Sequence, residues 1–413
     1  MARSIGASGP STGSVVQAAS PALPRGPVLD WSSFQRTNAP GIHSIENLPN
    51  VLFTTSGRGA IYQALLLLKL PPGSTVLVPT YHCPTMVAPV LLAQLSPAYF
   101  PIGDDGLPAL EGLAPDVRAR SKAIIVAHYF GLPRSLAKVR AWCDTHGIAL
   151  IEDCAHCYFG EAGERPVGGW GDFATASLSK FFPVPEAGLV ASAHRRIEAP
   201  PLERPPAKLQ LKGWVDVLEF AAQYQRLAGL NRVLAPLFGL KNARAGTTPV
   251  ASRPGSATVA ESDMMRDCDM GRIRQKPLWA AMTLKAVLPR GRVILRRQKN
   301  YRIYDDLLNN VKGARPLVSL PSTPVAPYVF PLWVDDADRV YHALKALALP
   351  VFRWDRIWPG TPCAPGDAGP QWSRHVLQLL CHQDLSESDI VRIATATVQL
   401  LADPQPVPSS SLA

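Results

Sequence analysis

Short apolar runs alternate with longer stretches of helical periodicity over most of this chain. Runs such as Thr75–Val78 (TVLV) and Ala123–Ala127 (AIIVA) are too short for helices and end at proline or polar residues, so they predict buried strands. Between strands, apolar residues spaced by three and four predict helices, as over Leu136–Thr145, which stops near Gly147. Continuously apolar strands that alternate with helices predict an α/β fold with a largely parallel sheet covered on both faces.

The same pattern predicts the other elements of the chain. The further strands are Ile148–Ile151, Ala174–Leu178, Leu189–Ala191 and Val329–Val334, and the further helical segments are Ala60–Leu68, Met264–Asn309, Ala337–Leu347 and Glu387–Leu401. In parallel sheets ligands bind at the carboxyl ends of the strands. Residues that directly follow the predicted strands are therefore the first candidates for chemistry.

The rhythm of strands and helices breaks in three places, which divide the chain. Residues 1–28 and 403–413 are rich in small residues and proline without periodicity, and we predict a disordered leader and a tail. Residues 197–262 form an insertion within a large domain, 29–285, and residues 286–402 form a smaller C-terminal domain. The insertion contains an apolar set that fits buried core, a dimer contact or a membrane-surface helix: Val215, Leu218, Ala222, Leu227 and Leu230.

Composition excludes several classes of protein. The net charge of +10 is spread along the chain, with local density only over Leu288–Arg302, so it favours anionic substrates over nucleic acid. No run reaches the roughly 18 apolar residues of a transmembrane segment, and the N-terminus lacks a signal-peptide pattern. The odd number of cysteines and the single C-x-x-C, Cys154–Cys157, argue against a disulfide framework and a zinc site. We predict a cytoplasmic enzyme without a bound metal.

A lysine follows the predicted strand Ala174–Leu178, in the motif Ser177-Leu178-Ser179-Lys180. A lysine that forms a Schiff base must be held rigidly and kept partly neutral, and the end of a buried strand provides both conditions. The hydroxyl of Ser177, three residues earlier, can reach the phosphate of a bound cofactor. Lys180 is therefore a candidate for holding pyridoxal 5'-phosphate (PLP), and the alternative is a solvated loop lysine.

An acidic pair ends the strand Ile148–Ile151, in the sequence IALIEDCAHC. A carboxylate just beyond a buried strand suits pairing with the protonated pyridine nitrogen of PLP, which keeps the cofactor an electron sink. Asp153 is the candidate, with Glu152 turned the other way. The alternative is an ordinary helix N-cap aspartate.

Small residues open the helical run near residue 60, in the sequence Thr55-Ser56-Gly57-Arg58-Gly59-Ala60. Such residues let backbone amides approach a phosphate, and a helix N-terminus favours an anion. Ser56 and Gly57 are candidate phosphate contacts, and Arg58 can add a charge-assisted bond or point to solvent. Simple capping of the helix by Ser56 is the alternative.

Aromatic rings follow the strand Thr75–Val78, in the sequence VPTYHCPT. A flat ring at this place can stack on the pyridine of PLP, and the candidates are Tyr81 and His82. The alternative is a turn that happens to be rich in bulky residues.

The order of these motifs resembles the DegT/StrS-type aminotransferases, a fold-type-I PLP family known for amino-sugar synthesis. The resemblance is best over residues 50–192, and further similarities lie in His128–Pro133, Arg296–Leu308 and Leu380–Ile390. It implies a large domain built on a mostly parallel seven-stranded sheet, a smaller α/β domain and a homodimer with shared sites. It also implies that Lys180 holds PLP and moves the proton, that Asp153 pairs with the pyridine nitrogen, and that the phosphate is bound by Gly57, Arg58 and Ser177.

The chain departs from this family at several positions. His156 stands where the family has a glutamine that touches the phenol oxygen of PLP, and a histidine titrates differently. Cys83 aligns with the usual stacking aromatic, and Arg58 replaces a small polar residue. The asparagine-bearing segment that reaches the partner's cofactor is not recognisable around Met270–Arg274.

These features predict a PLP-dependent aminotransferase with two small-molecule substrates. The expected reaction transfers an amino group, with glutamate as donor, to a keto group of a nucleotide-linked sugar or similar polar substrate in polysaccharide or secondary-metabolite biosynthesis. Arg353 and Arg356, beside Trp354 and Trp358, can hold a diphosphate or carboxylate or be plain surface charge. The alternatives are another PLP reaction, such as dehydration or decarboxylation, and a non-catalytic binding or regulatory protein.

Overall fold

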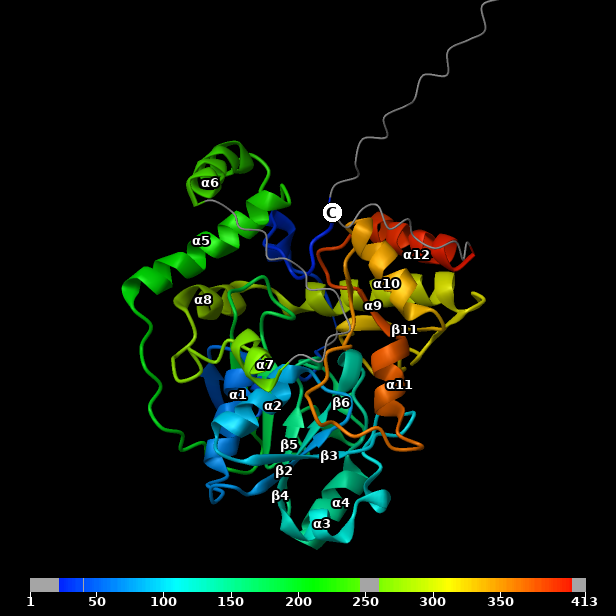
Figure 1. Cartoon of the computed structure of the whole chain (residues 1–413). Coiled ribbons are helices and arrows are strands. Elements are labelled where there is room, and N and C mark those ends of the chain that lie inside the picture. Colours follow the sequence, from blue (N-terminus) through cyan, green and yellow to red (C-terminus); the bar gives the residue numbers. More distant parts are fainter. Residues whose placement is uncertain (1–21, 40, 246–259, 403–413) are drawn as a thin grey trace, which may run out of the picture.

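The computed structural model describes residues 22–39, 41–245 and 260–402, and within them a seven-stranded sheet is the centre of the fold. Its strand order is β1-β9-β8-β5-β4-β2-β3, and only β9 runs against the rest. Figure 1 shows β2, β3, β4 and β5 in the lower part of the molecule. The strands are β1 (Asn50–Thr54), β2 (Thr75–Pro79), β3 (Ser96–Phe100), β4 (Ser121–Ala127), β5 (Ala149–Asp153), β8 (Phe173–Ser177) and β9 (Gly188–Ser192). The mostly parallel sheet predicted from the sequence is confirmed.

Successive residues of the central strands face two different apolar cores. In β2, Val76 and Val78 join the core that includes α1 (Gly57–Leu67) and α2 (Pro84–Leu92), whereas Leu77 joins the core that includes α4 (Ala137–His146). Side chains of a strand alternate between its faces, so burial on both sides requires the continuous apolar runs of the sequence. A short helix, α3 (Pro115–Arg120), precedes β4, and a small hairpin joins β6 (Glu161–Ala162) to β7 (Arg165–Pro166).

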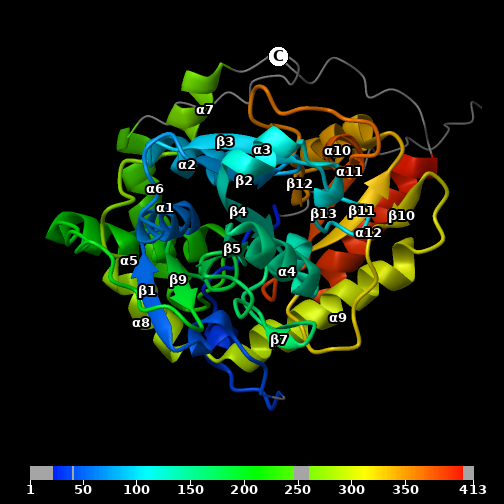
Figure 2. The same cartoon turned by 90° about the horizontal axis from the view of Figure 1, so that it is seen from below.

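A four-stranded antiparallel sheet forms the second part of the fold, with strand order β10-β11-β13-β12. In Figure 2 its strands lie on the right and those of the large sheet on the left. The strands are β10 (Ala314–Pro316), β11 (Val329–Val334), β12 (Val351–Phe352) and β13 (Val376–Leu380), and the helices are α9 (Arg290–Leu308), α10 (Ala337–Ala346), α11 (Ala368–His375) and α12 (Glu387–Ala402). Short 3-10 helices cover Trp31–Phe34, Ile45–Asn47, Leu110–Gly112 and Tyr129–Gly131.

Prolines divide the long helical region that was predicted over Met264–Asn309. It consists of α7 (Glu261–Asp267), α8 (Trp279–Val287) and α9, with Pro277 before α8 and Pro289 as the N-cap of α9. Proline lacks the N–H that a helix interior needs and disfavours helical geometry in the residue before it. The region is therefore three helices and not one.

The predicted insertion forms an arm of two helices, α5 (Ala207–Gln223) and α6 (Asn231–Ala245), at one side of the molecule (Figure 1). Residues 246–259 lie outside the described part of the chain. In the predicted apolar set, Ala222 and Leu227 are buried in a core shared with α8, whereas Leu230 is partly exposed. Among the described residues, no helix has the length and apolarity needed to cross a membrane.

The last residues of the predicted leader are folded, which corrects the boundary at residue 28. Leu23 and Val28 are buried, and the backbone N–H of Val28 donates to Asp384 Oδ2 at 3.0 Å. The carbonyl of Pro24 lies 3.0 Å from His382 Nε2. Apolar contacts and these bonds fix the segment, although it has no periodicity that a sequence pattern can detect. Residues 1–21 and the predicted tail, 403–413, lie outside the described residues.

Candidate active site

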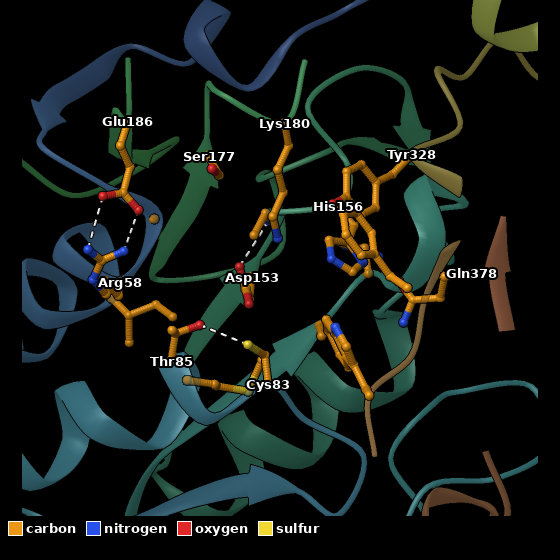
Figure 3. A pocket seen from close by; sticks show the side chains of 18 residues that line it. Arg58, Cys83, Thr85, Asp153, His156, Ser177, Lys180, Glu186, Tyr328 and Gln378 are labelled. Carbon is orange, nitrogen blue, oxygen red and sulfur yellow. Dashed lines mark hydrogen bonds and ion pairs between the residues drawn. The ribbon is translucent and has the colours of Figure 1, made fainter. Parts of the chain in front are cut away.

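A cavity of about 320 Å³ lies between the carboxyl ends of the large-sheet strands and the small sheet. Figure 3 shows Arg58 and Glu186 on one side of Lys180 and His156 and Tyr328 on the other. Six of the residues singled out in the sequence line this cavity: Gly57, Arg58, Asp153, His156, Ser177 and Lys180. They come from segments spread over 120 residues, and the parallel sheet brings them to one edge.

The N-terminus of α1 and the end of β8 meet at one end of the cavity. A Cβ atom added to Gly57 would lie 3.3 Å from the Cβ of Ser177, which shows how closely the two backbones approach. Ser56 caps the helix, because its Oγ accepts the N–H of Gly59 at 3.0 Å. Backbone amides at a helix start, together with the Ser177 hydroxyl, form the kind of cradle that binds a phosphate. Ser56 does not line the cavity, so its alternative role as a cap is the one seen.

Arg58 forms a two-pronged ion pair with Glu186. Its Nη1 contacts Glu186 Oε1, its Nη2 donates to Glu186 Oε2 at 3.0 Å, and its Nε donates to the carbonyl of Asp269 at 3.0 Å. The guanidinium therefore ties α1 to the segment that follows Lys180. The charge-assisted bonds that we expected Arg58 to make with an anion are made with a carboxylate of the same chain.

Asp153 ends β5 and turns its carboxylate into the cavity. Its Oδ1 accepts the N–H of Ala155 at 3.0 Å and the hydroxyl of Thr175 at 3.1 Å. Burial raises the pKa of Asp153 above its ordinary value, although Lys180 acts in the opposite direction. No helix begins here, so the N-cap alternative does not apply to Asp153.

Lys180 stands just beyond β8, with its ammonium nitrogen 5.2 Å from the ring centroid of Tyr328. Burial lowers the pKa of Lys180 below its ordinary value, and Cys83, Asp153 and Glu186 offset part of this effect. A buried lysine with a lowered pKa spends more time as the neutral amine, which is the nucleophilic form.

His156 lies against the aromatic wall of the cavity. Its ring stacks on Tyr328 at 4.3 Å between centroids and contacts Trp354 at 4.9 Å. Burial, and then the nearby Lys180, hold the pKa of His156 well below its ordinary value. A neutral imidazole has one donor and one acceptor nitrogen, so it keeps a hydrogen bond to offer.

The two rings predicted to stack on a cofactor do not reach the cavity, which corrects that prediction. Tyr81 is fully buried beside Trp354 and Trp372, and its hydroxyl accepts from the amide of Gln378 at 3.2 Å. His82 is held between the carbonyl of Pro79, 2.8 Å from Nδ1, and the N–H of Trp358, which donates to Nε2 at 3.0 Å. The turn after β2 directs these two side chains into the protein interior.

Cys83 and Thr85 occupy the place on the cavity wall that the rings were expected to fill. The hydroxyl of Thr85 donates to Cys83 Sγ at 3.1 Å. No aromatic ring of the segment after β2 therefore faces the cavity. Cys83 was recognised in the sequence only as the position where the family aromatic is missing.

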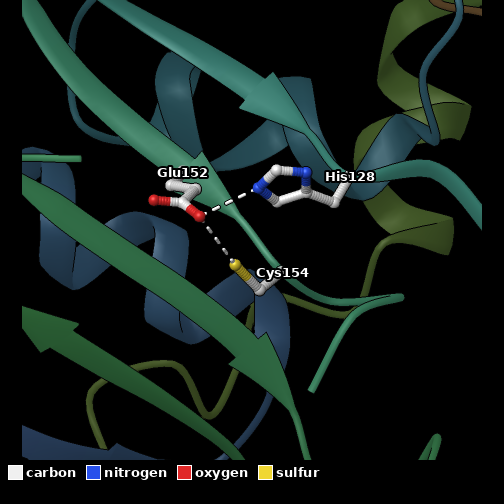
Figure 4. Close-up of side chains that lie close together, drawn as sticks. All are labelled: His128, Glu152 and Cys154. Atoms are coloured by element: carbon white, nitrogen blue, oxygen red, sulfur yellow. Dashed lines mark hydrogen bonds and ion pairs between the residues drawn. The ribbon is translucent and has the colours of Figure 1, made fainter. Parts of the chain in front are cut away.

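Glu152 lies on the other side of β5 from Asp153, and it holds His128 (Figure 4). Its carboxylate accepts from His128 Nε2 at 2.8 Å and from the backbone N–H groups of Gly168, Trp170 and Gly171 at 2.6, 2.9 and 3.1 Å. With Cys154, these side chains place three potential metal ligands within 4.8 Å. The carboxylate already accepts these four bonds and a longer one from Cys154 Sγ, 3.8 Å from its Oε1, so the cluster is better described as a histidine oriented by a glutamate. His128, in turn, lines the cavity.

Several residues of the cavity wall were not found from the sequence. Glu186, Tyr328, Phe352 and Gln378 carry no motif, and Trp354 was singled out only as a neighbour of two arginines. Those arginines lie elsewhere. Arg353 pairs with Asp338 and donates to two backbone carbonyls, and Arg356 pairs with Asp267. Both arginines thus pair with carboxylates of this chain, and neither lines the cavity.

Comparison with known proteins agrees with this geometry. The model of the DegT/DnrJ/EryC1/StrS aminotransferase family matches residues 46–200. This segment of the chain is therefore similar to that family. The family domain includes the α1 N-terminus, Asp153, Ser177 and Lys180, whereas the small-sheet wall of the cavity lies outside the match.

Two curated relatives resemble the family domain. One is the UDP-N-acetyl-3-dehydro-alpha-D-glucosamine 3-aminotransferase of Acidithiobacillus ferrooxidans, 29% identical over 42% of this chain and 49% of the relative. The other is the GDP-perosamine synthase of Vibrio cholerae, 28% identical over 33% of this chain and 38% of the relative. The match thus spans half or less of each relative.

Solved structures resemble the chain over most of its length. Helicobacter pylori PseC, an aminotransferase involved in the biosynthesis of pseudoaminic acid, has a TM-score of 0.61 at 14% identity and covers 93% of this chain and 100% of its own. DesI, solved in the presence of its TDP-sugar product, has a TM-score of 0.59 at 18% identity and covers 87% and 82%. At these identities the likeness confirms the predicted fold class and no more.

Proposed function

We propose that this chain is a PLP-dependent aminotransferase that moves an amino group, with glutamate as the donor, to a keto group of a nucleotide-linked sugar or similar polar substrate. One observation carries the proposal: Lys180, Asp153 and the cradle at Gly57 and Ser177 surround one cavity within a DegT-family domain. The relatives support the substrate class, because their names specify UDP- and GDP-linked sugars.

The residues of the cavity fit PLP. The cofactor needs an amine, a carboxylate for its pyridine nitrogen and a phosphate cradle, and this wall provides Lys180, Asp153, and the α1 N-terminus with Ser177. A resembling structure, of ntda from Bacillus subtilis, contains the related cofactor PMP. When bound, PLP supplies an electron sink for the negative charge that develops on the substrate carbon.

Each side chain would have a distinct task. The neutral Nζ of Lys180 would hold the cofactor and would take up and return the proton of the substrate carbon. The carboxylate of Asp153 pairs with the protonated pyridine nitrogen, and the positive charge placed there favours its ionised form despite burial. His156, which remains neutral, donates a hydrogen bond at the place where the family uses glutamine.

The opposite wall is suited to a sugar. Trp354 and Phe352 present apolar ring surface, and Gln378 brings a buried amide from β13. A few placed polar groups among aromatic rings give a pocket both affinity and orientation for a small polar ligand. We also propose a homodimer in the cytoplasm, and the seven free cysteines fit a reducing compartment.

Absorbance spectroscopy of the purified chain, reconstituted with PLP, tests the proposal. We expect a visible band that borohydride removes and that glutamate bleaches in the absence of an acceptor. A band that glutamate leaves unchanged, while another amino acid is dehydrated or decarboxylated, would favour a different PLP reaction. A colourless protein that does not take up PLP would contradict both and favour a non-catalytic role.

A further inference from the structure

A charged side chain that no motif identified lies directly beneath the lysine loop. Arg297, in α9, is fully buried. Its described hydrogen bonds all go to neutral oxygens of segments that follow β8, precede β11 and follow β13. A buried guanidinium without a carboxylate partner is costly, since burial penalises its charge. The hydrogen bonds of Arg297 therefore have to compensate for that cost, and they hold specific backbone segments in place.

One end of this network holds the backbone just after Lys180. Arg297 Nη2 donates to the carbonyl of Lys180 at 2.6 Å, and its guanidinium carbon lies 4.6 Å from the ring centroid of Phe181. Arg297 Nε donates to Gln383 Oε1 at 2.9 Å, and Gln383 Nε2 donates to the carbonyl of Phe181, also at 2.9 Å. Two consecutive carbonyls in an irregular turn are therefore fixed by α9 and by the segment after β13.

The other end of the network holds Tyr328. Arg297 Nη1 donates to the carbonyl of Pro327 at 2.9 Å and contacts that of Tyr328 at 3.5 Å. The ring of Tyr328 faces the Lys180 nitrogen and stacks on His156. A single side chain therefore sets the backbone beneath the amine and the backbone of the ring that covers it.

We propose that Arg297, assisted by Gln383, is a positioning residue that holds the Lys180 amine in its desolvated place in the cavity. The role rests on the proposed function, in which Lys180 is the cofactor lysine. Without these hydrogen bonds, the backbone of Lys180 and the ring of Tyr328 can move independently, and the amine gains access to water. Its pKa then rises toward the ordinary value and less of it is neutral near pH 7.

Asn300 provides a matched control for a merely structural role. It lies one turn further along α9, is also fully buried, and donates to three carbonyls: Cys381 at 3.3 Å, His382 at 3.1 Å and Leu385 at 3.3 Å. These acceptors flank Gln383 and none belongs to the lysine loop, so Asn300→Ala loosens that segment and leaves the bonds of Arg297 and Gln383 themselves in place. Asn300→Ala should therefore reduce thermal stability without changing Lys180.

The test measures the reactivity of Lys180 in the full chain free of PLP. Wild type and the variants Arg297→Lys, Gln383→Met and Asn300→Ala are incubated with pyridoxal, which lacks the phosphate, over a pH series. Cyanoborohydride traps the adduct, and peptide mass spectrometry compares Lys180 with the exposed Lys122. In parallel, thermal melts measure the stability of each variant.

We expect Lys180 of the wild type to react faster than Lys122 near neutral pH. Arg297→Lys and Gln383→Met should slow Lys180 by about tenfold for each unit by which its pKa rises, and should move its pH midpoint upward. Asn300→Ala should leave both the rate of Lys180 modification and its pH midpoint unchanged. If Arg297→Lys does not fold, Gln383→Met alone decides, because it removes the bonds of Gln383 with Phe181 and Arg297 and leaves the Arg297 bonds to Lys180 and Pro327 in place.

Two results are distinguishable. A fast Lys180 that Arg297→Lys and Gln383→Met slow no more than Asn300→Ala does, at equal loss of melting temperature, would overturn the role of Arg297. A wild-type Lys180 that reacts no faster than Lys122 would count against the proposed function itself.

Discussion

The two walls of the cavity differ in how closely their residues specify a ligand. The large-sheet wall holds an amine, a carboxylate and a phosphate cradle, all within the family match over residues 46–200. The small-sheet wall holds Tyr328, Phe352, Trp354 and Gln378, all beyond that match. The first wall has the groups that PLP requires, whereas the second has rings and an amide that suit many polar ligands. The cofactor can therefore be inferred from the sequence motifs of the first wall. The choice of acceptor depends on the second wall, which carries no motif.

The largest effect should come from the amine of the large-sheet wall. Lys180→Ala removes the group that we propose moves the proton, and we expect the glutamate half-reaction to slow by about 10⁴-fold. The melting temperature should stay close to that of the wild type, because the variant leaves the Lys180 backbone in place. Stopped-flow absorbance and a thermal melt measure the two quantities. A Lys180→Ala protein with normal turnover would contradict the assignment of the lysine.

Asp153 and Glu152, which are neighbours in β5, allow catalysis and stability to be compared within one strand. Asp153→Asn should slow the half-reaction by about 10³-fold with little loss of stability, because the amide cannot neutralise the pyridinium charge. Glu152→Gln should do the reverse, destabilising the fold by about 1–3 kcal/mol, since four donors face its carboxylate. Urea unfolding and single-turnover kinetics of both variants check this. Equal kinetic losses in the two would show that the sides of β5 are not distinct in function.

The small-sheet wall should affect the acceptor and spare the donor. Gln378 Oε1 is buried without a hydrogen-bond partner, and such a group gains from a donor on a ligand. Gln378→Leu should raise the KM for the sugar acceptor by up to about tenfold and leave the glutamate half-reaction unchanged. Steady-state kinetics with the acceptor varied, compared with the isolated donor reaction, measures this. A slower glutamate half-reaction with an unchanged KM for the acceptor would contradict the proposed contact of Gln378 with the acceptor.

The smallest effect concerns acid stability. Burial alone raises the pKa of Glu152, but bonds from His128 and from the amides of Gly168 and Trp170 outweigh burial, and the net pKa lies below the ordinary 4.5. A lowered folded pKa contributes stability above the unfolded value, and this contribution is lost as the pH falls through the folded pKa. Unfolding free energies measured from neutral pH to below about pH 4.5 should decline less steeply in Glu152→Gln than in wild type. Parallel slopes in the two proteins would contradict the lowered pKa.

The sequence was most informative where local pattern alone decides the structure. The short apolar runs predicted β2, β4, β5 and β8, because strands covered on both faces bury successive side chains in two cores. They missed β3, whose residues Ser96–Phe100 include a proline and partly exposed positions typical of an edge strand. The strand β13 was also missed, although it is buried throughout, because Gln378 interrupts its apolar run.

The parts of the site that failed prediction depend on distant contacts. Tyr81 and His82 sit in a turn, where the direction of a side chain is set by packing against Trp354, Trp372 and Tyr99. Arg58 meets a glutamate 128 residues away, and Arg297 meets a carbonyl 117 residues away. Such pairings cannot be inferred from spacing along one chain, so the anchors of the lysine loop emerge only from the folded structure.

The reversed strand β9 has a consequence for when the Lys180 amine becomes buried during folding. Since β8 and β9 are antiparallel, the chain returns directly and the Leu178 N–H bonds the Ala187 carbonyl at 2.9 Å, without a crossover helix. That closure is local and should form early in folding, whereas the Arg297 contact must await the small sheet. We therefore expect a newly made chain to carry an ordinary solvated lysine until its two sheets dock, so that reactivity is acquired at the last step of assembly. Pulsed aldehyde labelling during refolding would follow that change in time.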